Sequence, residues 1–300
     1  MLITVAQATA AYTGLKALFM KGFMPTDPTI ADMWKLIAMT APSDTEEEEY
    51  GWLKNLSFIR EWVGDRVLQN LTEANYKIKN KHFEGTVQVP VDKIRDRRLG
   101  GYSVAAEMLG QNARNFPNRL VFPLLAAGWT TIGLDGQYFF DTNHPVQNPD
   151  GSVSLVSNNG GGAGTAWYLL DTTKVVKPII YQERETFQPS ALTAPDSDHV
   201  FKRNELLFGV DGRCNVGYGL WQCAYGSKQP LTADNVWAAR AAMASIKGDN
   251  GEPLGITPNM LLVGPALEQA ARTALQAVIL NNTTNVLAGT MTPVVCPWLA

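Results

Sequence analysis

Cysteine and histidine are both scarce in this chain of 300 residues. It has three residues of each kind: Cys214, Cys223 and Cys296, and His82, His144 and His199. The cysteine count is odd, and no CxxC pair or Cys/His spacing typical of a zinc site occurs. We therefore expect three buried, reduced thiols, and neither a disulfide-stapled secreted domain nor a metal centre.

Signals for export and for membranes are also missing. The first residues carry no charged stretch ahead of an apolar one, and no apolar run approaches the roughly 18 residues that span a bilayer. Positive charge is not in excess either, because 25 Lys and Arg face 28 Asp and Glu, for a net charge of -3. A protein whose main task is to grip nucleic acid is usually basic. We expect no membrane association and a product made in the cytosol.

Catalytic motifs are missing as well, since no GxSxG, Walker or GxGxxG pattern occurs. The glycine run SNNGGGAG at 157–164 is typical of a loop. The best cluster of chemical groups is Asp135, Asp141 and His144 in DGQYFFDTNHP. It could form a metal or acid–base site, but DG and HP are also turn signals, and we expect a turn. The sequence indicates no enzyme, no cofactor and no metal.

What is present is an ordinary globular composition, 45% hydrophobic and 18% charged. The length favours about two domains, and helical and alternating patterns both occur, which predicts an α+β fold. Helices are expected at 4–22, 43–54, 101–127 with a bend at Pro117, 233–246 and 266–279. In the helix at 43–54, Thr45 and Glu48 would form a capping box and the glutamate run an exposed first turn. Expected strands are 167–170, 175–181, 204–225, 259–263 and 291–296.

Residues 58–92 read as two long strands joined near Thr72–Asn75, in which Val87, Val89 and Val91 share a face. Both strands carry charges on both faces, and such an isolated hairpin is marginal in water. We expect it to contribute little to its own core and to need a partner surface. The lysines along the hairpin could make electrostatic contacts with a neighbour, remain solvated or form a cross-link. For a cross-link, the sequence marks no acceptor asparagine with an activating carboxylate. The following KIRDRR (93–98) suits either nucleic acid or a salt-bridged subunit contact.

Several blocks together resemble one known family, the major head subunit of Mu-like phages. They are REWVGDRVLQNL (60–71), YKIKNKHFEGTV (76–87), DGQYFFDTNHP (135–145), WYLLDTTKVVKPIIYQERE (167–185), LLFGVDGRCNVGYGLWQCAYGS (206–227) and PLGITPNMLLVGPALEQAAR (253–272). The resemblance implies the Hong Kong 97-type phage capsid fold. Its parts would be an N-terminal arm at 1–44, an E-loop hairpin and its base at 45–100, a P-domain with spine helix and long sheet at 101–128 and 175–228, and an A-domain at 129–174 and 229–300. The borders between 129 and 230 stay open.

The resemblance also implies a function. The chain would be the major capsid protein of a tailed bacteriophage, assembling in the host bacterial cytoplasm into hexamers and pentamers of the icosahedral head, a virion shell around double-stranded DNA. Implied partners are other copies, a separate scaffold protein, a portal protein, a possible cement protein and the packaged DNA, bound non-specifically. The alternatives are a phage tail-tube or decoration protein, or a hydrolase. Candidate inter-subunit contacts are Arg60, Trp62, Arg66, Lys77, Ile78, Lys79 and Val87, with Trp62, Ile78 and Val87 as the apolar ones.

Overall fold

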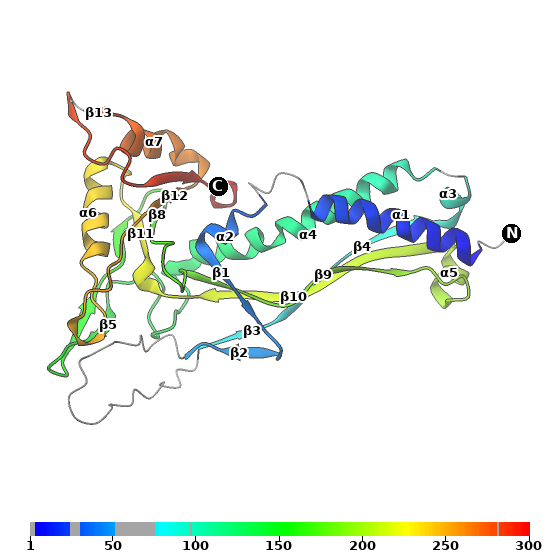
Figure 1. Cartoon of the computed structure of the whole chain (residues 1–300), viewed down its shortest axis with the longest axis horizontal. Coiled ribbons are helices and arrows are strands. Elements are labelled where there is room, and N and C mark those ends of the chain that lie inside the picture. The colour runs from blue at the N-terminus through cyan, green and yellow to red at the C-terminus, as the bar shows by residue number, and fades with distance from the viewer. Residues whose placement is uncertain (1–3, 25–30, 52–75, 97, 281) are drawn as a thin grey trace.

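A computed structural model of the chain describes residues 4–24, 31–51, 76–96, 98–280 and 282–300. The molecule is elongated, and Figure 1 shows two bodies that meet near the C-terminal end of one long helix. The first helix of the chain begins at the far tip of the narrow body, and the C-terminus lies where the two bodies meet. Among the described residues, no helix has the length and apolar character needed to cross a membrane.

The narrow body is a four-stranded sheet of order β1-β9-β10-β4. Its strands are β1 Ala38–Pro42, β4 Lys81–Pro90, β9 Ile179–Leu192 and β10 Glu205–Tyr218. β1 runs parallel to β9, whereas β9–β10 and β10–β4 are antiparallel. β9 and β10 have 14 residues each and form the long ribbon that runs the length of this body (Figure 1).

Helix α4, Gly100–Ala126, packs along this sheet and confirms the predicted helix at 101–127. Its 27 residues reach about 40 Å at 1.5 Å per residue. The expected bend at Pro117 does not interrupt it, since the helix continues through Pro117 and Pro123. Its buried side includes Ala106, Gly110, Ala113, Pro117, Val121, Phe122 and Leu125.

Helix α1, Val5–Phe23, lies against α4 and confirms the predicted helix at 4–22. A capping box between Thr4 and Gln7 satisfies its first backbone donors. The two helices come into close contact at a pair of glycines. A Cβ on Gly22 would lie 2.1 Å from the Glu107 carbonyl oxygen, and one on Gly110 would lie 2.1 Å from the Phe19 carbonyl oxygen. The first helix of the chain is therefore held by its own long helix.

The second body is built on a five-stranded sheet of order β15-β12-β8-β11-β7. The strands are β7 Asn159–Gly162, β8 Trp167–Leu170, β11 Ala224–Lys228, β12 Met260–Val263 and β15 Thr292–Val295. Helices α6, Ala233–Ala244, and α7, Glu268–Gln276, cover one face, where Trp167 and Leu169 pack. Both faces of β8 and β12 are buried, which explains why WYLL and MLLV are apolar at every position.

The other face of this sheet joins the two bodies through one shared hydrophobic core. Tyr168 and Leu170 from the five-stranded sheet meet Phe122 and Leu125 of α4 and Tyr181 of β9. The C-terminal turn Pro297–Leu299 closes this core, because the Trp298 ring stacks on Phe122 with centroids 5.8 Å apart. The bodies are thus packed on a common interior.

The remaining elements are short and lie at the edges of the two bodies. They are α2 Trp34–Ile37, β2 Glu47–Glu49, β3 Lys77–Lys79, α3 Val91–Arg95, β5 His144–Gln147, β6 Val153–Val156, α5 Asp198–Arg203, β13 Ile279–Leu280, β14 Thr283–Thr284, and single 3-10 turns at 127–129, 221–223, 249–251, 265–267 and 297–299.

Two local predictions were wrong. In place of the expected helix at 43–54, of which the structure describes 43–51, Glu47–Glu49 form the strand β2. It pairs antiparallel with the basic strand β3, because a partner of opposite charge was available. Glu48 still accepts hydrogen bonds from Thr45, but within a turn that leads into a strand. The glycine run predicted as a loop contains β7, which pairs parallel with β11 at the edge of the sheet.

Three segments pack in other parts of the structure than the regions to which the sequence assigned them. Residues 38–42, expected in the arm, form β1 of the four-stranded sheet. Residues 224–228, expected with the long sheet, form β11 of the five-stranded sheet. Residues 81–90, expected in an under-supported hairpin, pair with β10 along their whole length, so the partner surface of this strand is its own chain.

Candidate assembly surfaces

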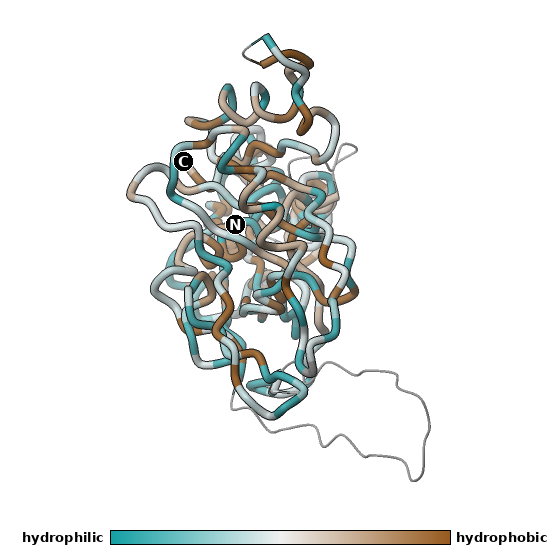
Figure 2. The backbone as a smooth tube through the Cα atoms, turned by 90° about the vertical axis from the view of Figure 1, so that its left-hand side faces the viewer, coloured by the Kyte–Doolittle hydropathy of each residue, from teal (hydrophilic) through white to brown (hydrophobic). Residues whose placement is uncertain are grey.

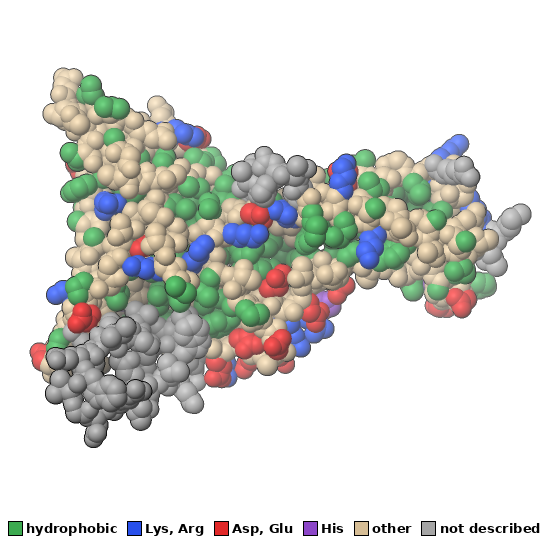
Figure 3. Space-filling view, in the orientation of Figure 1, with side chains coloured by type: hydrophobic (Ala, Val, Ile, Leu, Met, Phe, Trp, Pro, Cys, Tyr) green, Lys and Arg blue, Asp and Glu red, His purple; other side chains and the backbone are tan. Residues whose placement is uncertain are grey.

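A charged rim marks the point where segment 52–75 departs from and returns to the sheet. β2 and β3 pair antiparallel there, and Tyr50 N–H donates to the Tyr76 carbonyl oxygen at 2.8 Å. We call β2, β3, Tyr50 and Tyr76 the root. Lys77 lies 2.6 Å from Glu49 and 3.3 Å from Glu47, and Lys79 lies 2.8 Å from Glu46. Figure 3 shows acidic and basic side chains gathered along the lower edge of the molecule, where β2 and β3 lie in Figure 1.

The sign of each pKa shift agrees with this pairing. Hydrogen bonds to Glu49 and Glu47 raise the pKa of Lys77, and the hydrogen bond to Glu46 raises that of Lys79. The same bond lowers the pKa of Glu46. The two predicted contact lysines therefore already have carboxylate partners within their own chain.

The predicted apolar contacts differ in their surroundings. Ile78 is only 3% exposed and packs among Ala41, Tyr50 and Ile180, so it contacts its own core and offers nothing to a neighbour. Its burial corrects the sequence-based expectation, because its strand lies on the sheet. Val87 on β4 is partly buried against the core between the sheet and α4. Arg60, Trp62 and Arg66 lie outside the described residues.

Exposed apolar side chains occur at both ends of the molecule, and none of them was among the predicted contacts. The narrow body exposes Val104, Met108 and Phe201, and the second body exposes Val153, Leu155, Trp237, Val278, Ile279 and Val286. Figure 2 shows the projecting β13–β14 hairpin with a hydrophobic flank at the top of the view. These side chains are available for contact with other protein.

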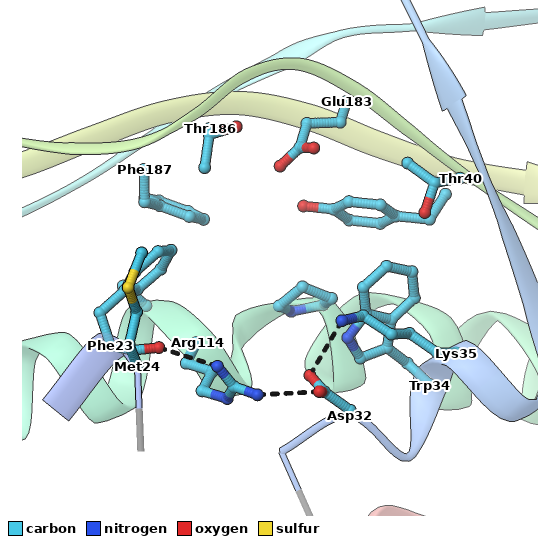
Figure 4. Close-up of a pocket in the computed structure, with 13 residues that line it drawn as sticks. Phe23, Met24, Asp32, Trp34, Lys35, Thr40, Arg114, Glu183, Thr186 and Phe187 are labelled. Atoms are coloured by element: carbon cyan, nitrogen blue, oxygen red, sulfur yellow. Dashed lines mark hydrogen bonds and ion pairs between the residues drawn. The ribbon is translucent and has the colours of Figure 1, made fainter. Parts of the chain in front are cut away.

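A groove of about 350 Å³ lies between α4, the end of α1 and β9. Figure 4 shows Arg114 on its floor, donating to the Phe23 carbonyl oxygen at 3.0 Å and to Asp32 at 2.8 Å. Asp32 also pairs with Lys35 at 3.3 Å. Asp32 is thus paired with both cations, whereas the buried Arg114 Nε has no hydrogen-bond partner among the described residues. The groove is a polar contact between helices, and its lining residues show no catalytic or metal-binding arrangement.

The structure brings two members of the predicted Asp135, Asp141 and His144 cluster together. His144 Nδ1 lies 2.6 Å from Asp135 Oδ2, and His144 Nε2 lies 3.0 Å from Asn158 Oδ1. Asp141 instead accepts from the backbone N–H groups of Thr142 and Asn143, as a turn residue does. The imidazole is fully buried and stacks on Trp221 at 3.9 Å.

This arrangement suits a structural role. Both imidazole nitrogens have protein partners, so neither is free to take a proton from a substrate. Across the described residues, no three His, Cys, Asp or Glu side chains are arranged to hold a metal ion. The three cysteines are buried, as predicted, and burial raises the pKa of Cys214 to about 11 and of Cys223 and Cys296 to about 12. Thiols of that kind are inert.

Comparison with known sequences gives whole-length relatives. The family model for the Mu-like prophage major head subunit gpT matches residues 8–299. The Mu-like prophage FluMu major head subunit of Haemophilus influenzae is 40% identical over 272 residues, covering 87% of this chain and 88% of the relative. The major capsid protein of Escherichia phage Mu is 38% identical over 309 residues, covering 100% of both chains.

Comparison with solved structures agrees. A subunit from the procapsid of bacteriophage JBD30 matches with a TM-score of 0.86 and 37% identity, covering 99% of this chain and 100% of that one. A subunit from the JBD30 capsid matches with a TM-score of 0.77 and 28% identity, covering 100% of both chains. A JBD30 capsid decorated with minor capsid protein trimers gives 0.75 and 28%, covering 93% of this chain and 92% of that one.

These findings confirm the α+β Hong Kong 97-type capsid fold. The relatives are head subunits that match over nearly their whole length, which supports a shell subunit over a tail-tube protein, a decoration protein or a hydrolase. The chain therefore belongs to the family of Mu-like prophage major head subunits and is a major capsid protein of a tailed phage.

Proposed function

We propose that copies of this chain form the hexamers and pentamers of an icosahedral head around a double-stranded DNA genome, assembled in the host bacterial cytoplasm. The observation that carries the proposal is the match to a procapsid subunit along 99% of the chain with a TM-score of 0.86. Exposed apolar side chains on both bodies give each copy several surfaces for neighbours. Individually weak contacts of this kind add up within a closed symmetric shell.

The regions expected from the resemblance can be proposed with adjusted borders. The narrow body, with α4 as the spine helix, is the P-domain, and the second body is the A-domain. Residues 1–44 are the arm and 45–100 the E-loop and its base, with β1 and β4 contributing to the P-domain sheet. β11 goes to the A-domain, since both strands that it pairs with, β7 and β8, lie there.

We propose that the E-loop reaches a neighbouring copy through Arg60, Trp62 and Arg66, with Val87 nearer the base. Trp62 should contribute most, because buried aromatic side chains dominate interface energies. Lys77 and Lys79 would contribute less, since each would have to leave an ion pair that it already makes. Ile78 is no longer a candidate, because its own chain buries it.

Other partners follow from what a head requires. The JBD30 capsid carries minor capsid protein trimers, which supports a cement protein here as well. A separate scaffold protein, a portal protein and non-specific contact with packaged DNA remain predictions from the resemblance, and the net charge of -3 suits weak contact with DNA. We propose no catalytic role, because His144 is enclosed and both its ring nitrogens have partners.

Excision of segment 53–74 tests the proposal. Tyr50 and Tyr76 are hydrogen-bonded neighbours, so a short Gly/Ser turn can close the gap without straining the root. We expect the excised protein to melt cooperatively and to form no shells. Electron microscopy should show icosahedral shells only for the unaltered chain.

A Gly/Ser replacement of equal length separates the loss of side chains from the shortening of the chain. It too should fold and form no shells. Regular shells from the excised protein would contradict the E-loop assignment, and tubes from the unaltered chain would contradict the shell itself.

A further inference from the structure

The root of segment 52–75 is fastened to the four-stranded sheet by two residues that the charged rim hides. We propose that Gln182 of β9 and Gly217 of β10 are positioning residues for assembly: they form a joint that sets the direction in which the chain departs at Tyr50 and returns at Tyr76. The inference rests on the proposed function, in which that segment contacts a neighbouring copy.

Gln182 is a polar side chain with no exposed surface. Its Oε1 accepts from the Tyr50 hydroxyl at 3.0 Å, and its Nε2 donates to the Ile78 carbonyl oxygen at 3.1 Å and to Asn80 Oδ1 at 2.8 Å. Tyr50 precedes the segment, whereas Ile78 and Asn80 follow it. One amide on the sheet therefore holds both ends of the segment.

Gly217 supplies a socket for the returning end. A Cβ at this position would lie 2.3 Å from Ile78 Cδ1 and 2.9 Å from the Tyr76 hydroxyl oxygen, so only glycine leaves room for both. The Tyr76 hydroxyl oxygen accepts from the Tyr218 N–H, directly after the glycine. The Ile78 side chain fits over the sheet at the point where its backbone is bound by Gln182.

The buried joint and the exposed rim differ in what they can determine. The ion pairs at the rim are solvated and are screened by salt, so they fix the direction of the departing and returning chain only weakly. The joint excludes water, and a buried amide has to keep its hydrogen-bond partners or lose stability. Burial also raises the pKa of Tyr50 and of Tyr76 to about 12, in keeping with the enclosure of both hydroxyls in the joint.

A buried glutamine is a costly way to fill this space, because an apolar side chain of similar volume needs no partners. The amide makes the contact directional. Its oxygen accepts a hydrogen bond only from the departing chain, and its nitrogen donates hydrogen bonds only to the returning chain. That selectivity suits a part whose orientation matters to a neighbouring copy.

The test uses the full chain with Gln182→Met, which keeps the length of the side chain and removes the hydrogen bonds. The matched control is Gln188→Met, an exposed position on the same strand. We expect amide hydrogen exchange over residues 76–80 to rise about tenfold in Gln182→Met, as the loss of a buried hydrogen bond predicts. We also expect cooperative melting to persist and the yield of regular shells to collapse. The control should exchange and assemble like the unaltered chain.

Tyr50→Phe is the second variant, since it removes one hydroxyl with little change of volume, and it should shift exchange and shell regularity in the same direction. Regular shells at full yield from both variants, with exchange raised, would overturn the positioning role. Unchanged exchange would show that Gln182 does not hold the root. Because the excised protein tests the E-loop assignment without altering Gln182, failure of the joint and failure of the proposed function give different results.

Discussion

At the scale of single residues, His144 is where a catalytic reading and a structural one lie closest together. The sequence offered a histidine near two aspartates, which left both readings open. The structure adds what spacing could not show: full burial, a ring stacked on Trp221, and an amide oxygen at the second nitrogen. Its role is to tie segment 135–158 to the shared core.

We predict that His144→Ala lowers the free energy of unfolding by about 2–4 kcal/mol, because it opens a cavity and removes the imidazole hydrogen bonds to Asp135 Oδ2 and Asn158 Oδ1. Urea titration of subunits not assembled into shells would measure the loss. The matched control is His82→Ala, whose side chain is 54% exposed and should matter by less than about 0.5 kcal/mol. Equal effects of the two changes would mean that the buried network does not stabilise the fold.

Other residues show why a sequence cannot place every contact. The lysines at 77 and 79 alternate with Ile78, and alternation correctly predicts a strand. The alternation does not reveal which face of the strand is left for a neighbour. That depends on the glycine at 217, more than 130 positions further along the chain. The burial of the three cysteines was predictable, because unpaired thiols without a motif are usually core residues.

At the scale of elements, the contact between α1 and α4 depends on the two glycines where the helices cross. We predict that Gly110→Ala destabilises the subunit by about 1–3 kcal/mol, because the added methyl group meets a backbone oxygen that cannot move aside. Thermal melting would show a lower midpoint.

Gly14→Ala serves as the control within α1, since a Cβ there meets nothing within 4 Å. Alanine favours a helix over glycine, so this change should stabilise by about 0.5–1 kcal/mol. A Gly110→Ala subunit as stable as the Gly14→Ala one would show that the close crossing is not needed.

Elements with a strong local pattern were the ones that the sequence predicted well. The buried residues of α1 and α7 recur at helical spacing, and β8 and β12 are short apolar runs bounded by turns. β2 and β7 were missed because their own residues do not favour strands. A run of glutamates becomes a strand only beside Lys77 and Lys79, and a glycine run does so only beside β11. In both cases the tertiary partner decides the conformation.

At the scale of the whole molecule, the two bodies share one hydrophobic core. This core holds the surfaces of both bodies in the same arrangement in every copy. The α+β class could be predicted from patterns, whereas the capsid architecture came from the resemblance of six sequence blocks. Strand order could not be predicted from pattern alone, since β15-β12-β8-β11-β7 joins strands from residue 159 to residue 295.

We predict that mature particles are held without covalent cross-links. Lys77 and Lys79, the two lysines of the root, are paired with carboxylates of their own chain. Particles boiled in detergent should therefore run as one band near 32.8 kDa. A ladder of multimers that persists under reducing conditions would refute this.

The position of Trp298 against Phe122 has a consequence for synthesis in the cell. Residues 292–299 supply an edge strand of one sheet and the turn that closes the shared core, and they emerge from the ribosome after every other described element. Contacts so distant in sequence form late, because the intervening chain has to be ordered first. A nascent or prematurely terminated chain lacks its closing turn and cannot bring its two bodies into their final relation. Chains cut short before residue 292 would then be kept out of a growing head.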